Sequence, residues 1–418
     1  MKRSVLGGAT VATVALAALL VGATPRTAPA QPRLATGPGW SRGWRPSDEV
    51  AGDEAWLAEG TVPGEGRRWR PMVRAALLDL HRLIGPGGAV AAGPVNGWNY
   101  VWPRDTAFVA AALAHAGHVQ DAEQALRFLQ RVRLPDGGFQ ARYRLDGSGP
   151  PDQRPRQADG AGWALWSLEE VSRVSGRSVT AASLRPLLDD STRFVLAGTD
   201  EGRRLPSPSP DYWEMPVTRT SLGTVAPLLA GLRASQRLYD SLGETALAQR
   251  SGAAADRLEA ALARRFGGRF ERFGQLGGLD AAVCFLMPPF AATATAAVQR
   301  RWNDYQDEAL RPAGGLAPGT AWRQDGISWT PETALVAYTA ALSGHTRQAE
   351  HWLDWLQAHR TSWGSLPEKV LGSGAPAGPA PLAWTSALVV LTAAGLPTGA
   401  VGEQPQDRHR GTVNLGRA

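Results

Sequence analysis

Helical patterns separated by turns rich in Gly and Pro fill the sequence from Pro71 onward. Apolar residues recur at intervals of three and four, the period of an amphipathic helix, in about twelve segments. Alternating runs long enough to form strands are scarce, so the pattern predicts an all-α domain. The helical segments span residues 72–84, 107–116, 122–132, 162–174, 184–196, 222–242, 247–266, 279–287, 294–305, 331–342, 347–359 and 381–394.

Two of the helical hairpins match each other in spacing, residue for residue. Residues 116–123 read Ala-Gly-His-Val-Gln-Asp-Ala-Glu, and residues 343–350 read Ser-Gly-His-Thr-Arg-Gln-Ala-Glu. A repeated hairpin indicates an array of helical pairs, and twelve helices make six pairs. Six pairs can close into an (α/α)6 toroid, whereas an open solenoid would expose its end repeats and usually has a shorter, stricter period. We therefore expect a closed toroid whose loops at one end surround a central cavity.

The first thirty residues have the order of a signal peptide. A positively charged start is followed by a mostly apolar stretch over residues 5–21 and by small residues up to Ala30. Cleavage after Ala30 would give a secreted protein. The alternative is an uncleaved helix that anchors the protein to the outer face of the cell membrane, because the apolar stretch approaches the length of a span. No later segment is apolar enough to cross a membrane, so the mature form is not expected to span one.

Four parts follow from this organisation. They are a signal peptide (1–30), an N-terminal extension (31–65), a single helical domain (66–397) and a polar C-terminal tail (398–418).

The composition excludes several classes of partner and cofactor. The net charge of +6 does not indicate nucleic-acid binding, because the Arg residues are scattered singly among Asp and Glu. Cys284 is the single cysteine, which excludes an intrachain disulfide and a cysteine-based metal site. The seven His residues are also spread singly and no carboxylate-rich calcium loop is present, so no metal and no other cofactor is expected. Since no long unpaired apolar stripe occurs, a monomer is favoured.

Tryptophan is unusually frequent, with 16 residues against 6 Tyr and 9 Phe. Flat indole rings are platforms for the apolar faces of sugar rings, although core packing explains a Trp equally well. Several loops next to helical patterns also combine carboxylates with aromatic or other polar residues. These loops span residues 99–105, 156–160, 210–214 and 365–369.

Two of the loop carboxylates fit the requirements of glycoside hydrolysis, which needs one protonated and one ionised carboxyl group. Glu214 fits the acid because its neighbours Tyr212 and Trp213 would supply apolar surroundings, which raise the pKa of a carboxyl group. Glu368 fits the base because the adjacent Lys369 favours an ionised carboxylate. An ordinary solvated loop acid is the alternative for each.

The four loops, in this order, resemble those of the glucoamylase-type glycoside hydrolases of family 15. Residues 102–105 (Trp-Pro-Arg-Asp) are similar to the family signature that grips the terminal sugar, and residues 157–160 (Gln-Ala-Asp-Gly) to its second sugar-contacting loop. Residues 210–214 resemble the loop that carries the general acid. Residues 366–369, followed by 381–387, resemble the motif of the last hairpin, which carries the general base.

The resemblance implies that Glu214 is the general acid and Glu368 the general base of an (α/α)6 barrel enzyme. The implied reaction releases glucose from the non-reducing ends of α-linked gluco-oligosaccharides or polysaccharides with inversion, without a cofactor. Trp329, which precedes a late helix, is a further candidate for the cavity wall. The candidate substrate-binding residues are Trp102, Arg104, Asp105, Gln157, Asp159, Tyr212, Trp213, Trp329 and Trp384.

The sequence departs from the family pattern at two positions. Gln153 stands where many members have a Trp, four residues before the loop Gln, and Met215 follows Glu214 where a second acidic residue is common. Residues 31–65 are too few for the extra β-sandwich that bacterial relatives commonly carry, and only a short polar tail follows Pro397, so no starch-binding module is expected. Soluble oligosaccharides are therefore the expected substrates. Two alternatives stay open: an (α/α)6 hydrolase of another α-glycoside, and a non-catalytic sugar-binding toroid.

Overall fold

The computed structural model describes residues 32–36, 51–95, 97–176 and 178–397. The chain divides into a unit of residues 1–32 and a unit of residues 33–418, and the second unit contains all the helices and strands of the described residues. The expected signal peptide (1–30) and C-terminal tail (398–418) lie outside the described residues. No described helix is both long and apolar enough to cross a membrane.

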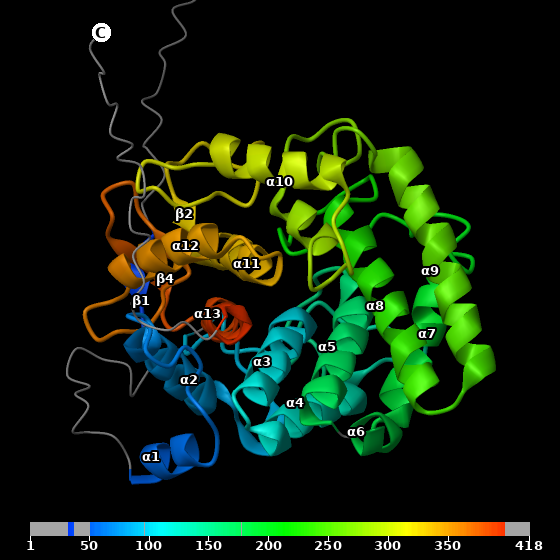
Figure 1. Ribbon diagram of the computed structural model, residues 1–418, viewed down its shortest axis with the longest axis horizontal. Coiled ribbons are helices and arrows are strands. Elements are labelled where there is room, and N and C mark those ends of the chain that lie inside the picture. Colours follow the sequence, from blue (N-terminus) through cyan, green and yellow to red (C-terminus); the bar gives the residue numbers. More distant parts are fainter. Residues whose placement is uncertain (1–31, 37–50, 96, 177, 398–418) are drawn as a thin grey trace, which may run out of the picture. The chain divides into compact units, whose positions relative to one another are not determined.

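Six helices form an inner ring, in which each helix packs against the next and the last packs back against the first (Figure 1). The ring closes without a gap in the order of the chain, so the predicted (α/α)6 toroid is confirmed. Its members are α3 (Pro103–His115), α5 (Asp159–Ser175), α8 (Leu222–Ser241), the 3-10 helix η3 (Ala281–Leu286), α11 (Thr330–Leu342) and α13 (Ala383–Gly395).

A second helix packs on the outside of each inner helix and completes six pairs. Taken in the order of the inner helices, the outer helices are α4 (Val119–Val132), α7 (Arg185–Gly198), α9 (Thr245–Phe266), α10 (Ala296–Glu308), α12 (Thr346–Ala358) and α2 (Arg70–Leu83). The described residues also contain the short helices α1 (Ala51–Ala58), η2 (Pro86–Gly88) and α6 (Ser178–Ser183).

Each of the twelve predicted segments overlaps one of the paired helices. The eighth segment differs from the prediction, because it forms only the six-residue 3-10 helix η3. The side chain of Asp280 caps η3 by accepting a hydrogen bond from the backbone N–H of Ala282. Pro288 and Pro289 follow directly after Met287 and prevent the turn from continuing as an α-helix.

The inner helices are largely buried and are rich in small residues. In α11, for example, every residue from Thr330 to Ala341 is buried, as expected for a helix enclosed by neighbours. Glycine allows a close approach between α5 and α8. A Cβ atom at Gly231 would stand 2.7 Å from Cα of Gly162, and one at Gly162 would stand 2.3 Å from the carbonyl oxygen of Pro227. The two backbones therefore touch only because neither position carries a side chain.

The two hairpins with matching sequences have matching turns. Gly117, between α3 and α4, and Gly344, between α11 and α12, both have left-handed backbones, with φ of +87° and +77°. Glycine adopts this conformation without the strain that a Cβ atom would introduce. The repeat in the sequence therefore corresponds to a repeated pair of an inner and an outer helix.

Part of the expected N-terminal extension packs against the barrel. α1 contacts α2, and the indole of Trp56 stacks on the imidazole of His118 with ring centroids 3.7 Å apart. Strand β1 (Leu34–Ala35) pairs in parallel with β4 (Pro376–Pro379), where Leu34 lies opposite Gly378. The described portion of the extension is thus continuous with the helical domain.

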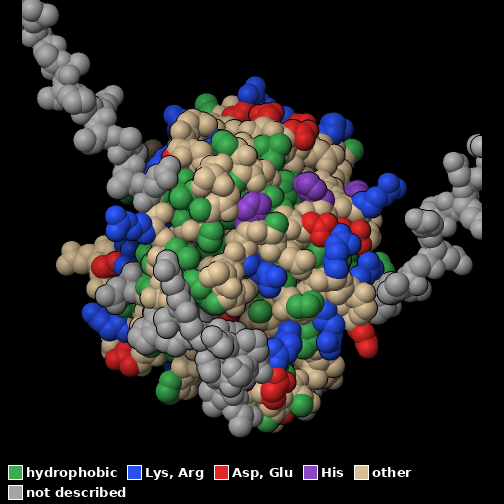
Figure 2. Space-filling view, turned by 90° about the vertical axis from the view of Figure 1, so that its left-hand side faces the viewer, with side chains coloured by type: hydrophobic (Ala, Val, Ile, Leu, Met, Phe, Trp, Pro, Cys, Tyr) green, Lys and Arg blue, Asp and Glu red, His purple; other side chains and the backbone are tan. Residues whose placement is uncertain are grey.

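A small sheet at one end of the ring was not predicted. Its order is β1-β4-β3-β2, with β2 (Ser328–Trp329) and β3 (Lys369–Val370) antiparallel to their neighbours. Trp329 lies opposite Lys369 in the β2–β3 pairing, which brings two loops of the barrel together at the start of α11. On the face of the molecule shown in Figure 2, basic side chains lie scattered beside acidic ones and form no continuous patch.

Candidate active site

A cavity of about 370 Å³ lies where several inner helices begin. The first turns of α3, α11 and α13, the loop before α8 and the loop before β3 line it. Nine of the residues proposed from the sequence meet in this cavity: Trp102, Arg104, Asp105, Tyr212, Trp213, Glu214, Trp329, Glu368 and Trp384. The cavity is called the central pocket below.

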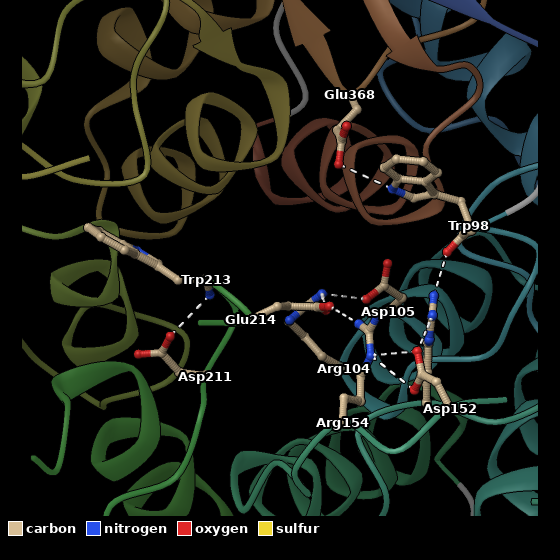
Figure 3. Close-up of polar contacts among 11 residues, drawn as sticks. Trp98, Arg104, Asp105, Asp152, Arg154, Asp211, Trp213, Glu214 and Glu368 are labelled. Carbon is tan, nitrogen blue, oxygen red and sulfur yellow. Dashed lines mark hydrogen bonds and ion pairs between the residues drawn. The ribbon is translucent and has the colours of Figure 1, made fainter. Parts of the chain in front are cut away.

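Glu214 reaches the central pocket from the loop before α8 with a left-handed backbone of φ +55°. Its carboxylate accepts a hydrogen bond from Arg154, and Nη2 of Arg104 lies 3.9 Å from its Oε1 (Figure 3). The surroundings of this carboxylate are therefore charged, whereas the sequence suggested apolar ones. Its sequence neighbours Tyr212 and Trp213 line the same pocket and make further contacts, with Asp280 and Arg272 respectively.

Asp211 fixes the turn that presents Glu214. Its Oδ1 accepts a hydrogen bond from the backbone N–H of Trp213 at 3.0 Å, and its Oδ2 accepts one from Ser221 at 2.6 Å. The backbone N–H of Glu214 donates to the carbonyl of Asp211 at 2.7 Å. Because a non-glycine residue with positive φ is strained, these hydrogen bonds are needed to hold Glu214 in place.

Arg272 connects this turn to the start of η3. Its guanidinium donates to Asp211 at 2.6 Å and to Asp280 at 2.8 Å, and it lies over the ring of Trp213 at 3.7 Å. Arg272 is 2% exposed and both aspartates are fully buried. The hydroxyl of Tyr212 donates to Asp280 as well. One buried cation thus binds two buried anions and supports the loop that carries Glu214.

A second set of charges lies on the other side of Glu214. Arg142 donates to the carbonyl of Gly97 at 2.6 Å and to Asp152, and Nε of Arg154 donates to the same aspartate at 3.1 Å (Figure 3). Arg154 is therefore positioned between Asp152 and Glu214. Sequence reasoning missed these three residues, because they lie between α4 and α5 in a segment without helical periodicity and outside the quoted motifs.

Glu368 enters the central pocket from a different side, directly before β3 (Figure 3). Its backbone N–H donates to the carbonyl of Pro379 at 2.9 Å, and its carbonyl accepts from the N–H of Thr330 at 3.0 Å. The residue is 8% exposed, and its carboxylate accepts a hydrogen bond from Nε1 of Trp98 at 3.2 Å. Nζ of Lys369 lies 2.8 Å from its Oε2, so the lysine forms the expected ion pair with this carboxylate.

Arg104 and Asp105 form the floor of the pocket at the start of α3. Nη2 of Arg104 donates to Asp105 at 3.0 Å, and its guanidinium lies over the ring of Trp384 at 4.5 Å. Burial raises the pKa of Asp105, and the charge of Arg104 opposes this shift. Nε and Nη1 of Arg104 are buried without a hydrogen-bond partner. This arginine therefore retains unused donors at the pocket.

Indole rings form much of the pocket wall. Trp322 lies edge-on between two others, with ring centroids 4.8 Å from Trp213 and 5.5 Å from Trp329. Five pocket-lining tryptophans have a buried Nε1 that donates no hydrogen bond within the described residues: Trp102, Trp213, Trp322, Trp329 and Trp384. Buried donors of this kind are normally satisfied, so the wall offers several hydrogen bonds to a ligand rich in acceptors.

Gln157 and Asp159, which the sequence also proposed, do not line the central pocket. Asp159 is buried at the start of α5, where its Oδ2 accepts a hydrogen bond from Nε1 of Trp163 on the same helix at 3.1 Å. Burial raises the pKa of Asp159 to about 7. Gln157 lies at a separate cavity, beside Ser209 and Phe194. Their placement does not support direct contact with a ligand in the central pocket.

Glu332, in the first turn of α11, is a third glutamate of the central pocket that sequence reasoning did not select. The sequence signal that could have identified Glu332 is a carboxylate at the start of a helix, three residues after Trp329. No group of three or more His, Cys, Asp or Glu side chains that could hold a metal ion occurs in the described ranges. Cys284 is buried, and burial raises the pKa of its thiol to about 12.

The fold and the pocket define an (α/α)6 barrel with acidic and aromatic side chains at one end. Solved structures with the same fold include a wild-type glycosidase, with a TM-score of 0.68 and 20% identity over 82% of this chain and 99% of that chain. A glycosidase in complex with glucose matches equally well, with a TM-score of 0.68, 20% identity and the same coverage.

Two glucoamylases are also similar. That from Saccharomycopsis fibuligera has a TM-score of 0.64 and 16% identity over 82% of this chain and 94% of that chain. A bacterial glucoamylase complexed with acarbose has a TM-score of 0.64 and 17% identity over 77% of this chain and 55% of that chain. No protein-family model and no curated protein matches the sequence. At these identities the likeness concerns the fold.

Proposed function

We propose that this protein is a glycoside hydrolase that releases glucose from the non-reducing ends of α-linked gluco-oligosaccharides with inversion. The observation that carries the proposal is the meeting of Glu214 and Glu368, from loops far apart in the sequence, in one pocket lined with indoles. The glycosidases and glucoamylases that share the fold, one of them in complex with glucose, support the choice of a glucoside.

In the proposed reaction, Glu214 donates a proton to the departing glycosidic oxygen. Glu368 accepts a proton from the water that attacks the anomeric carbon on the opposite face of the ring. Trp98 and Lys369 orient the carboxylate of Glu368 for this step through their contacts with its two oxygens. Arg104 and Asp105 bind hydroxyl groups of the terminal ring, which uses binding energy to orient the substrate.

The ion pair between Arg154 and Glu214 adds one requirement to this mechanism. Arg154 occupies one carboxylate oxygen of Glu214, whereas a general acid has to face the leaving-group oxygen to donate its proton. The entering substrate therefore has to separate Arg154 from Glu214. Since the general acid borders the leaving group, Arg154 then lies beside the second sugar, near the place where Gln153 replaces the tryptophan common in family 15.

Proton NMR of the purified protein with maltose, maltotriose and isomaltotriose tests the proposal. We expect β-glucose to appear first, because inversion of an α-linkage gives the β-anomer. The Glu214→Gln and Glu368→Gln variants should abolish release, whereas Glu308→Gln, at an exposed position on α10, should leave it unchanged. Early α-glucose would refute inversion. A saccharide that binds without turnover in the wild-type protein would favour the non-catalytic alternative.

We also propose that the protein is secreted after cleavage following Ala30 and acts as a monomer. The order of charged, apolar and small residues in the first thirty positions supports secretion. Expression of the full chain, followed by N-terminal sequencing and light scattering of protein from the medium, tests both statements. A chain that stays attached to the cells with an intact N-terminus would refute cleavage, and a dimeric mass would refute the monomer.

A further inference from the structure

We propose that Glu332 is a substrate-binding carboxyl group that acts in its neutral form, holding a hydroxyl group of the sugar that lies between Glu368 and Arg104. The inference rests on the proposed function of the central pocket and adds a third acidic group to it. It concerns binding of the sugar and assigns Glu332 no proton transfer in the reaction.

The position of Glu332 places it among the residues of the site. It belongs to the first turn of α11 and lines the central pocket with Glu368 and Arg104. The helix start is fixed to the loop of Glu368, since the N–H of Thr330 donates to the carbonyl of Glu368 at 3.0 Å. The side chain of Glu332 is therefore held on the same side of the pocket as the proposed base.

The surroundings of Glu332 disfavour a charge. Its side chain is buried, with 3% of the residue exposed, and its Oε2 has no hydrogen-bond partner. None of the described cations forms an ion pair with it. An ionised carboxylate offers only acceptors and is costly to bury without donors. A neutral carboxyl group lacks that cost and provides one donor as well as acceptors.

The charged and titratable groups around Glu332 favour the same state. Burial raises the pKa of Glu332 to about 8, and the charges of Glu368 and Asp280 act in the same direction, while a hydrogen bond from its own backbone and the charge of Arg104 oppose them. Tyr305, from α10, also lies close enough to interact, but its own pKa is raised well above the usual value and it stays neutral.

A neutral carboxyl group is suited to bind a sugar hydroxyl, which both donates and accepts hydrogen bonds. The O–H of Glu332 can donate to the hydroxyl oxygen while its carbonyl oxygen accepts the hydroxyl proton. Ionisation removes the donor and places a second negative charge beside Glu368. Binding of the sugar should therefore weaken as the pH rises through about 8.

Two substitutions distinguish the hydrogen bonding of the Glu332 side chain from the space that it fills. Glu332→Gln keeps a donor and an acceptor and cannot ionise, and Glu332→Leu keeps much of the volume but has no polar atom. Binding of maltose and isomaltose is measured by calorimetry between pH 6 and pH 9 in a Glu214→Gln background, which prevents turnover. Turnover is measured in parallel with the single variants at position 332, and Glu308→Gln serves as the control.

At pH 6 we expect the affinity and the turnover rate of Glu332→Gln to stay within about threefold of those of its parent. Above pH 8 the affinity of the parent should fall, whereas that of Glu332→Gln should stay constant. We expect Glu332→Leu to weaken binding by about tenfold or more, the effect of losing buried hydrogen bonds. Loss of turnover in Glu332→Gln as complete as in Glu368→Gln would overturn the inference and identify Glu332 as an ionised participant. Unchanged binding in both variants, with no pH dependence in the parent, would also overturn it.

The experiments distinguish a failure of the proposed hydrolase function from a failure of the inference about Glu332. If the wild-type protein releases glucose from no oligosaccharide, the hydrolase proposal fails, whereas the calorimetric comparison of the parent with the Glu332→Gln variant still tests the role of position 332. If Glu332→Leu does not fold, as judged by its thermal transition, the pH dependence of binding in Glu332→Gln alone decides the matter.

Discussion

Replacement of Arg272 by Met tests whether the buried charges behind residues 211–214 position Glu214. The guanidinium of Arg272 contacts Asp211 and Asp280 at 2.6 and 2.8 Å, and both aspartates are fully buried. Methionine fills part of the space but leaves two buried carboxylates without their cation. Removal of one partner from a buried ion pair typically costs about 3–5 kcal/mol, since the remaining charge is uncompensated.

This free energy converts into a measurable shift of the melting temperature. Unfolding entropies of about 2.1 cal/mol/K per residue give about 0.7 kcal/mol/K for the roughly 350 described residues. A loss of about 3–5 kcal/mol then lowers Tm by about 4 to 7 °C in scanning calorimetry. Glucose release, measured well below this Tm, should fall by on the order of 10²-fold because Glu214 loses the support of its strained turn.

The matched control is Arg203→Met, which removes an exposed arginine that pairs with Asp200 on the surface. Exposed pairs contribute about 0–1 kcal/mol, so Tm should change by no more than about 1.5 °C and activity should stay at the wild-type level. If Arg272→Met matched Arg203→Met in both measurements, the charges behind the loop would have no role in stability or in placing Glu214.

Two further predictions concern the loop of Glu368 and the support beneath it. Gly378 and Gly374 both have left-handed backbones, with φ of +73° and +86°, but only a Cβ atom at Gly378 would meet Glu368, at 2.9 Å from its Oε2. In denaturant titrations, Gly378→Ala and Gly374→Ala should therefore each lower the free energy of unfolding by about 1–2 kcal/mol. Only Gly378→Ala should also lower kcat, by more than tenfold. Equal kcat values for the two variants would contradict this prediction. Burial raises the pKa of Asp79 to about 7, so the folded state binds an extra proton and the wild type loses stability as the pH rises from about 4 to 7. The Asp79→Asn variant still accepts the hydrogen bond from Ser365, so its free energy of unfolding in thermal melts should match that of the wild type at pH 4. At pH 8 the variant should be more stable than the wild type by up to about 4 kcal/mol. The same difference in stability at both pH values would refute the account.

The helical architecture could be predicted because it depends on local patterns. The apolar period identified every paired helix, and the two glycine turns identified the repeated hairpin. Even η3, which differs from its prediction in helix type, lies within the predicted segment. The small sheet could not be predicted, because strands such as β2 and β3 are two residues long and show no alternation.

The site could be predicted only in part, because burial and charge depend on the path of the chain. Glu368 and Lys369 are neighbours in sequence, so their contact followed directly. Arg154 reaches Glu214 only because the segment between α4 and α5 passes beside the loop before α8. Asp159 looked equivalent to Asp105 at a helix start, yet it turns back to Trp163 on its own helix.

Closure of the ring means that the barrel has no structural first or last hairpin. α13 packs against both α3 and α2, and the side chain of Arg67 donates to the carbonyl of Pro397 at 2.8 Å, so the two ends of the barrel lie together. The covalent order of the hairpins is therefore one of several that produce the same ring. A circularly permuted chain, joined across these ends and opened at the turn of Gly243 between α8 and α9, would retain every neighbour of the central pocket.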